Sequence, residues 1–247
     1  FWPLPQQRDE AMAKRRIGVG FTGMGNTLAM LQLRYNAPEG RAMAARIAER
    51  MRDAAYEASV ALAQEKGAFP KFNADGYLAP GTFASRLPAA LQKSIRKHGI
   101  RNSHLLSLAP TGTGSLTFGN NCPSGCEPVF SFMEKRYIKQ ADGTRKLEDG
   151  LKNFAYLQFR RMEGEDASLP EYFESAQTID VSAHVEMLKT LAPFVDAAIS
   201  KTVNIPEDYP CEDFKSVYMD GWAGGLKGLT TFRPNNELGS VIIVDDG

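Results

Sequence analysis

The segment from Lys201 to Phe232 constrains the fold most, because strand, helix and strand patterns follow one another there. Strands are predicted over residues 201–205 and 228–232. Pro210 opens the helix between them, which is expected to carry on one face Phe214, Val217, Tyr218 and Trp222. Two strands joined through a helix are expected to be parallel, with a right-handed crossover. The sequence therefore predicts an α/β fold, and 247 residues allow one large domain or two small ones.

The clearest helix is predicted over residues 38–66. Pro38 fits its first position, and Gly67 supplies the stop. Apolar residues recur every three or four positions, which predicts a buried face. That face consists of Met43, Ile47, Met51, Ala54, Ala58 and Leu62.

Shorter elements are predicted around this helix. Asp142 and Gly143 favour a turn with positive φ, and the hairpin built on that turn is expected to project from the main body. Pro193 is expected to break a helix that begins near Asp180. The ranges are a strand over 17–21, a helix from 25 to near 36, a loop with aromatic plugs over 68–80, a helix over 88–98 and the hairpin over 137–147.

A buried strand at Leu105 to Ala109 ends in a bend rich in Thr and Gly, at residues 110–115. Such a bend suits an anionic ligand, because Gly leaves backbone N–H groups approachable and Thr and Ser add hydroxyl donors. A plain strand-to-loop turn is the alternative interpretation. The bend is not a Walker A loop, since no Gly-Lys-Ser/Thr follows it.

The string from Gly18 to Gly23 has the G-x-G-x-x-G spacing of dinucleotide-binding loops. The region some 20 residues further on, 43–53, is predicted to be helix, so the acidic ribose contact has no obvious source. We therefore interpret the glycines as close packing of a strand against a helix.

Charge and cysteine content bound the function classes. The 29 basic and 29 acidic residues cancel, so no general field attracts nucleic acid or a membrane surface. Three cysteines are too few for a disulfide framework and favour the reducing cytoplasm. Cys122 and Cys126 are interpreted as small buried thiols in a turn rather than a zinc site, and Cys211 as a packing residue. No apolar run approaches 18 residues and no signal-peptide pattern opens the chain, which predicts a soluble protein.

Both ends of the chain look cut. It begins with Phe1-Trp2-Pro3 rather than Met, and it stops just after the apolar run 241–244. We therefore expect residues 1–247 to be a fragment of a longer polypeptide.

Four strings, in order over residues 10–236, resemble the catalytic barrel of ribonucleotide reductase large subunits, specifically its carboxy-terminal part in the adenosylcobalamin-dependent class. Each string alone would be weak, and their shared order makes the resemblance specific. The strings are RIGVGFTG at 16–23, SLAPTGTG at 107–114 with CEPVF at 126–130, DAAISKTVNIP at 196–206 and LKGLTTFRPN at 226–235.

The resemblance implies a ten-stranded α/β barrel of two parallel five-stranded halves, of which this chain supplies the later strands, with helices outside. It also implies that the loop after the Ser-Leu-Ala-Pro strand binds the phosphates of the ribonucleotide substrate, with Ser115 beginning the helix behind them. The diphosphate would then be held by Pro110, Thr111, Gly112, Thr113, Gly114 and Ser115.

In that family a cysteine thiyl radical abstracts the 3′-hydrogen of the ribose, and further cysteines deliver the electrons that replace the 2′-hydroxyl by hydrogen. The resemblance places these residues in an Asn-x-Cys-x-Glu string and strands upstream of Phe1, so no catalytic residue is expected in this chain. Cys122, Cys126 and Cys211 do not match the family's redox thiols.

Thr230 and Thr231 bear on the source of the radical. The di-iron class carries two adjacent tyrosines at these positions, which relay the radical from a second subunit. Since an aliphatic hydroxyl is no redox relay, the resemblance favours adenosylcobalamin bound beside the active cysteine. It implies a ribonucleoside diphosphate substrate, a thioredoxin-like reductant, a homodimer of the full-length chain, no direct nucleic acid or membrane partner, and a cytoplasmic location.

Two alternatives stay open. One is the large subunit of a di-iron or glycyl-radical reductase, although no Arg-x-x-Gly-Tyr string stands near Gly247. The other is a catalytically silent nucleotide-binding relic.

Overall fold

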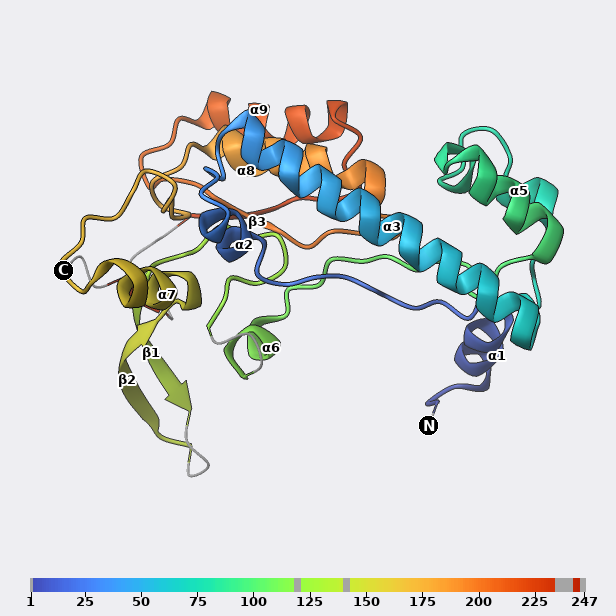
Figure 1. Cartoon of the computed structure of the whole chain (residues 1–247), viewed down its shortest axis with the longest axis horizontal. Helices are drawn as coiled ribbons and strands as arrows, with labels where there is room; N and C mark the ends of the chain where they lie inside the picture. Colours follow the sequence, from blue (N-terminus) through green and yellow to red (C-terminus); the bar gives the residue numbers. More distant parts are fainter. Residues whose placement is uncertain (1, 118–120, 140–142, 234–241, 245–247) are drawn as a thin grey trace. The chain divides into compact units, whose positions relative to one another are not determined.

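The structure, a computed structural model, describes residues 2–117, 121–139, 143–233 and 242–244. The chain divides into two units (Figure 1). Unit 1 comprises Phe1–Gly20, Arg46–Leu108 and Pro193–Ala198, and unit 2 comprises Phe21–Ala45, Ala109–Ala192 and Ile199–Gly247.

Unit 1 is helical apart from two extended segments. Its helices are α1 (Pro5–Lys14), most of α3 (Pro38–Lys66), α4 (Ala74–Tyr77) and α5 (Ala89–His98), with a 3-10 turn at Ala84–Arg86. The bounds predicted for α3 are confirmed, and Gly67 ends it with a φ of +80°. The aromatic plugs are confirmed too, since the rings of Phe69, Phe72 and Tyr77 contact one another.

The predicted buried face of α3 is wrong. Met43, Ile47 and Met51 are only half-buried, whereas Ala54, Ala58 and Leu62 are exposed. The buried face lies one position further along the helix and includes Ala44, Ala48, Arg52, Tyr56, Val60 and Ala63. Polar partners select this face, because the Tyr56 hydroxyl donates to the Asp196 carboxylate at 2.7 Å and the Arg52 guanidinium lies over the Phe194 ring.

The two extended segments of unit 1 pair in parallel through a bridge between Val19 and Leu106. The Val19 N–H donates to the Leu105 carbonyl at 2.6 Å, and the Ser107 N–H donates to the Val19 carbonyl at 3.0 Å. A Cβ on Gly18 would lie 2.4 Å from Ser107 Oγ, and one on Gly20 only 2.2 Å from the Ser107 carbonyl oxygen. The glycine string thus permits close approach of two extended segments, and the predicted packing of strand against helix is wrong.

Unit 2 contains the remaining helices and the sheets. The helix after the glycine string, α2, ends at Met30 rather than near Asn36. The helix before Pro193 ends at Leu191 and continues as a 3-10 turn, which confirms the predicted break. The helices are α2 (Met24–Met30), the start of α3, α6 (Gly112–Thr117), α7 (Phe154–Glu163), α8 (Val181–Leu191) and α9 (Cys211–Ala223).

The predicted hairpin is present. Strands β1 (Met133–Lys139) and β2 (Arg145–Lys152) are antiparallel, and β5 (Ile242–Val244) pairs with the other edge of β1. In Figure 1 the hairpin extends away from α7 of the same unit. Residues 140–142 of its turn, including Asp142, lie outside the described residues.

The strand–helix–strand prediction is confirmed. β3 (Thr202–Asn204) and β4 (Thr230–Phe232) are parallel, with Thr202 opposite Thr230, and α9 lies between them in the chain. Their core joins β3, α8 and α9 through Val181, Val185, Val203, Ile205 and Val217.

Only part of the predicted α9 face is buried. Val217 is buried and Phe214 packs against the core, but Tyr218 and Trp222 are 42% and 75% exposed.

The described residues do not close into a barrel. They form one two-stranded parallel sheet, one three-stranded antiparallel sheet and isolated parallel bridges. Within the same residues no helix combines the length and apolarity that crossing a membrane would require.

Candidate functional site

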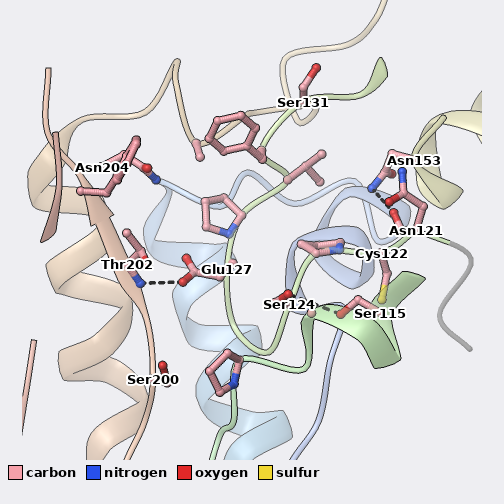
Figure 2. A pocket seen from close by; sticks show the side chains of 18 of the residues that line it. Ser115, Asn121, Cys122, Ser124, Glu127, Ser131, Asn153, Ser200, Thr202 and Asn204 are labelled. Atoms are coloured by element: carbon pink, nitrogen blue, oxygen red, sulfur yellow. Dashed lines mark hydrogen bonds between the residues drawn. The ribbon is translucent and has the colours of Figure 1, made fainter. Parts of the chain in front are cut away.

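A cavity of about 520 Å³ lies within unit 2 (Figure 2). The bend after Ala109 forms one side of it, and the turn from Asn121 to Ser131 forms a second. Ser200 and the strands β3 and β4 supply the remaining wall, together with Asn153 and Ala176. These segments are distant in the sequence, and folding of unit 2 brings them around one hollow.

The bend at Pro110 to Ser115 opens on this cavity, because Pro110, Gly112 and Ser115 are among its lining residues. Thr111, Thr113 and Gly114 belong to the same bend but are not lining residues. Thr111 has a φ of +34°, and α6 begins at the next residue. Gly112 to Ser115 therefore form the first turn of the helix, so the expectation that the helix begins at Ser115 is wrong.

The backbone of the bend is accessible. No described residue accepts a hydrogen bond from the backbone N–H groups of Gly112, Thr113 or Gly114. A Cβ built on Gly112 or Gly114 would meet nothing within 4 Å. Three N–H groups next to open space are the donors that an anionic oxygen requires.

The hydroxyl groups of Thr22, Thr111 and Ser115 form hydrogen bonds that stabilise the bend. The Gly125 N–H donates to Thr111 Oγ1 at 3.2 Å, and the Ser115 hydroxyl donates to the Thr111 carbonyl at 2.8 Å. Thr22 Oγ1 lies 2.9 Å from Thr111 Oγ1. Sequence reasoning missed Thr22, although it belongs to the glycine string at 18–23.

A buried ion pair supports the opposite wall. The Lys201 ammonium, whose side chain is fully buried, donates to Glu127 Oε2 at 2.7 Å, to the Thr202 carbonyl at 3.1 Å and to His184 Nδ1 at 2.8 Å. Glu127 Oε1 accepts the Thr202 N–H at 2.6 Å, as Figure 2 shows. All three ammonium protons thus have acceptors, and Glu127 is attached to the start of β3.

His184 stays neutral in this network. Burial, reinforced by the positive charge of Lys201, lowers the pKa of His184 to about 3. Its unprotonated Nδ1 can therefore accept a hydrogen bond from the Lys201 ammonium. Sequence reasoning missed Glu127, Lys201 and His184 as a unit, although the first two stand in the strings at 126–130 and 196–206.

The three cysteines are free thiols in different surroundings. Cys126 is buried, as predicted, and burial raises its pKa to about 12. Cys122 is only half-buried and lines the cavity, so its predicted burial is wrong. Cys211 is exposed at the start of α9, so its predicted packing role is wrong as well. Among the residues that the structure describes, no group of three or more His, Cys, Asp or Glu side chains could hold a metal.

Thr230 and Thr231 line the cavity from β4. The Thr231 hydroxyl lies 3.0 Å from the Tyr218 hydroxyl, and Tyr218 is 42% exposed on α9. A phenol therefore stands directly beside the threonine pair, which the sequence pattern did not indicate.

Comparison with known proteins identifies relatives over nearly the whole chain. Residues 1–232 match the family described as the barrel domain of ribonucleotide reductase. A vitamin B12-dependent ribonucleoside-diphosphate reductase of Mycobacterium tuberculosis is 30% identical over 262 residues, covering 98% of this chain and 34% of the relative. The protein of the same name from Thermoplasma acidophilum is 26% identical, covering 98% and 31%.

A ribonucleoside-diphosphate reductase subunit alpha of Treponema pallidum is 26% identical over 238 residues, covering 94% of this chain and 26% of the relative. The chain thus spans about a third or less of the length of these curated relatives.

Proposed function

Because the chain belongs to the ribonucleotide reductase barrel-domain family, we propose that residues 1–247 form the later part of the catalytic barrel of an adenosylcobalamin-dependent ribonucleoside-diphosphate reductase. In the complete enzyme, a ten-stranded barrel of two five-stranded halves would include β3, β4 and the extended segments that pair at Val19 and Leu106. The reaction is radical-based reduction of a ribonucleotide to a deoxyribonucleotide.

The open bend beside the cavity is the observation that carries this proposal. Pro110, Thr111, Gly112, Thr113, Gly114 and Ser115 hold the substrate diphosphate. The N–H groups of Gly112, Thr113 and Gly114, which have no acceptor among the described residues, donate to phosphate oxygens, and hydroxyls of the bend add further donors. Open space above both glycines allows phosphate oxygens to approach the backbone.

The wall opposite the bend is compatible with an anionic substrate. Glu127 lines the cavity and would repel a diphosphate if its charge were uncompensated. Lys201 neutralises that charge at 2.7 Å, and both carboxylate oxygens are already occupied as acceptors. The ion pair thus shapes the cavity without opposing the substrate.

The β4 side of the cavity suits a cofactor better than a radical relay. Thr230 and Thr231, with Ser200 and Asn204 nearby in the lining, present small polar side chains that leave room beside the strand. Adenosylcobalamin bound beside the active cysteine would supply the radical that starts the reaction, and Thr230 and Thr231 would leave space for it on the β4 side of the cavity.

The remaining assignments complete the proposal. A thioredoxin-like dithiol reduces the complete enzyme, which works as a homodimer in bacterial or archaeal cytoplasm, without nucleic acid or membrane as a partner. The cysteines that perform the chemistry lie outside this chain.

One observation favours a second candidate, a large subunit that receives its radical from a partner. Tyr218, which is partly exposed, reaches Thr231 at the cavity wall and is the kind of side chain that can carry a radical. The cofactor requirement separates the two candidates. The complete reductase is expected to turn over ribonucleoside diphosphates with adenosylcobalamin alone, and activity that requires a di-iron subunit instead would refute the class assignment.

The bend itself is tested with Gly112→Ala in the complete reductase. The added methyl group has no atom of the described residues within 4 Å but occupies the approach to the backbone, so the substrate KM should rise roughly ten- to a hundredfold without loss of thermal stability. Gly76→Ala in α4, where a Cβ also meets nothing, is the matched control and should behave as wild type. An unchanged KM for Gly112→Ala would contradict the phosphate site.

A further inference from the structure

Thr22 links the proposed phosphate-binding bend to the turn that follows α6 in the chain. Its hydroxyl oxygen lies 2.9 Å from Thr111 Oγ1, 3.1 Å from Ser115 Oγ and 3.1 Å from the Pro123 carbonyl oxygen. It also accepts the Gly125 N–H at 3.2 Å. One exposed side chain therefore contacts both the bend and the turn at 123–125.

The backbone around Thr22 holds this side chain in place. The Gly23 N–H donates to the Pro123 carbonyl at 2.9 Å, and the Met24 N–H donates to the Gly125 carbonyl at 3.2 Å. Gly23, with a φ of +81°, then leads directly into α2. Thr22 is thus presented from a rigid helix start rather than from a free loop.

An inventory of protons shows what Thr22 does for the bend. A hydroxyl has one proton to donate and can accept two hydrogen bonds. Thr22 donates its proton to the Pro123 carbonyl, and Ser115 donates its own to the Thr111 carbonyl. The Gly125 N–H is shared between Thr22 Oγ1 and Thr111 Oγ1.

Among these three hydroxyls, only that of Thr111 does not donate its proton to a backbone carbonyl. Its nearest acceptors are the hydroxyl oxygens of Thr22 and Ser115, at 2.9 and 3.3 Å. When a ligand oxygen takes that proton, the Thr22 proton can turn from the Pro123 carbonyl to Thr111 Oγ1 and keep the two side chains bonded, because the Pro123 carbonyl still accepts the Gly23 N–H. Thr111 is therefore the hydroxyl of this group best able to turn its proton toward a ligand.

The conformation of Thr111 needs such support. A φ of +34° is uncommon for a β-branched residue and costs of the order of 1–3 kcal/mol unless the surroundings fix it. The hydroxyl contacts to Thr22 and to Gly125 are the side-chain interactions that can do so.

We propose that Thr22 is a positioning residue of the phosphate site: its hydroxyl holds Thr111 in the left-handed conformation and aims the Thr111 proton at a substrate phosphate. This inference rests on the proposed function of the bend. It also gives a role to the glycine string at 18–23. That string binds no dinucleotide in this proposal, but its Thr22 contacts the bend.

The experiment compares Thr22→Val, which removes the hydroxyl at nearly constant volume, with Thr22→Ser, which keeps it. Thr27→Val is the matched control, because among the described residues the Thr27 hydroxyl bonds to the Gly23 carbonyl at the start of α2 and not to the bend. KM and kcat for a ribonucleoside diphosphate are measured in the complete reductase. Equilibrium binding of the diphosphate and of the corresponding ribonucleoside without phosphates is measured alongside.

Thr22→Val is expected to raise KM and the diphosphate Kd about tenfold while kcat stays within about twofold. Thr22→Ser and Thr27→Val should match wild type, and binding of the phosphate-free ribonucleoside should be the same in every variant. A general structural role would weaken both ligands, so this selective loss identifies phosphate positioning.

Three results would overturn the inference: an unchanged KM in Thr22→Val, an equal loss in Thr22→Ser, or an equal loss of ribonucleoside binding. If Gly112→Ala raises KM as expected while Thr22→Val does not, only the role of Thr22 is refuted. If neither variant changes KM, the phosphate site is refuted as well.

Discussion

Thr111 lies immediately before α6 and Thr113 lies in its first turn, yet their side chains differ in surroundings. The Thr111 hydroxyl contacts Thr22, Ser115 and Gly125, whereas Thr113 is exposed. The sequence indicates both residues, because hydroxyls in a glycine-rich bend are typical donors to phosphate.

Replacing both threonines by Val in the complete reductase should lower kcat/KM by roughly 2–4 kcal/mol in transition-state terms, since a lost donor to a charged oxygen costs about 1.5–3 kcal/mol and two donors to the same diphosphate cost less than their sum. Steady-state kinetics with a ribonucleoside diphosphate measure the change. Thr117→Val, on the next turn of α6, is the control and should have no effect. A double variant with wild-type kcat/KM would count against the site.

Substitution of Tyr218 distinguishes the two proposed sources of the radical, adenosylcobalamin and a partner subunit. If adenosylcobalamin supplies it, the Tyr218 hydroxyl only bonds to Thr231, and Tyr218→Phe should keep turnover within about threefold of wild type. Turnover with and without added cobalamin is the measurement. Abolished turnover in a folded Tyr218→Phe enzyme would instead place the phenol on a radical path and refute the cofactor assignment.

Sequence reasoning found the residues of the bend but not those that support it. Thr/Gly composition after a strand is a local pattern, so residues 110–115 can be selected from sequence alone. Thr22, Glu127, Lys201 and His184 meet the site only through tertiary contacts across long stretches of chain. No local pattern encodes such contacts.

At the level of elements, the Glu127–Lys201 pair joins the turn before β1 to the start of β3. Lys201→Met removes a cation and leaves the Glu127 carboxylate with an uncompensated charge. Breaking such a pair is expected to lower the free energy of unfolding by about 3–5 kcal/mol. Denaturant unfolding of the complete reductase, monitored at the step in which the barrel domain unfolds, measures this loss of unfolding free energy.

The same experiment includes its controls. Lys189→Met breaks a more exposed pair with Glu186 on α8 and should cost less than about 1 kcal/mol. Glu127→Gln combined with Lys201→Met should recover much of the lost stability, because no unpaired charge then remains. Equal losses in Lys201→Met and Lys189→Met would show that the buried pair is not structurally important.

His184 predicts how this region responds to acid. Its pKa falls from about 6.5 in the unfolded chain to about 3 in the folded one, so between these values only the unfolded chain binds the proton. Stability should therefore fall as pH drops below 6.5, by up to about 1.4 kcal/mol per pH unit from this group. Unfolding free energies of wild type and His184→Gln between pH 7 and 4.5 measure the slope, which should be shallower in the variant. Parallel profiles would refute the burial argument.

Helices were easier to predict than their buried faces. Pro38 and Gly67 mark the ends of α3 by local backbone chemistry, which sequence shows directly. Which face is buried depends on partners such as Asp196 and Phe194, more than a hundred residues away. The apolar stripe of methionines and alanines was therefore a misleading guide.

At the level of the whole molecule, the residues themselves predict the local α/β pattern, whereas only the family resemblance implies a closed barrel. The described residues do not form that barrel. β3 and β4 are parallel as predicted, but the segments at Val19 and Leu106 form only an isolated bridge. Ile17 and Val19 are 46% and 40% exposed, although apolar strand residues in a parallel sheet are normally covered on both faces. This exposure supports the proposal that further strands of the complete reductase cover them.

The central claim is that the bend at 110–115 holds the substrate diphosphate, and a crystal structure of the complete reductase with a bound ribonucleoside diphosphate tests it most directly. We predict phosphate oxygens within about 3 Å of the backbone nitrogens of Gly112, Thr113 and Gly114. A diphosphate bound elsewhere in the barrel, with these three N–H groups facing only water, would contradict the account.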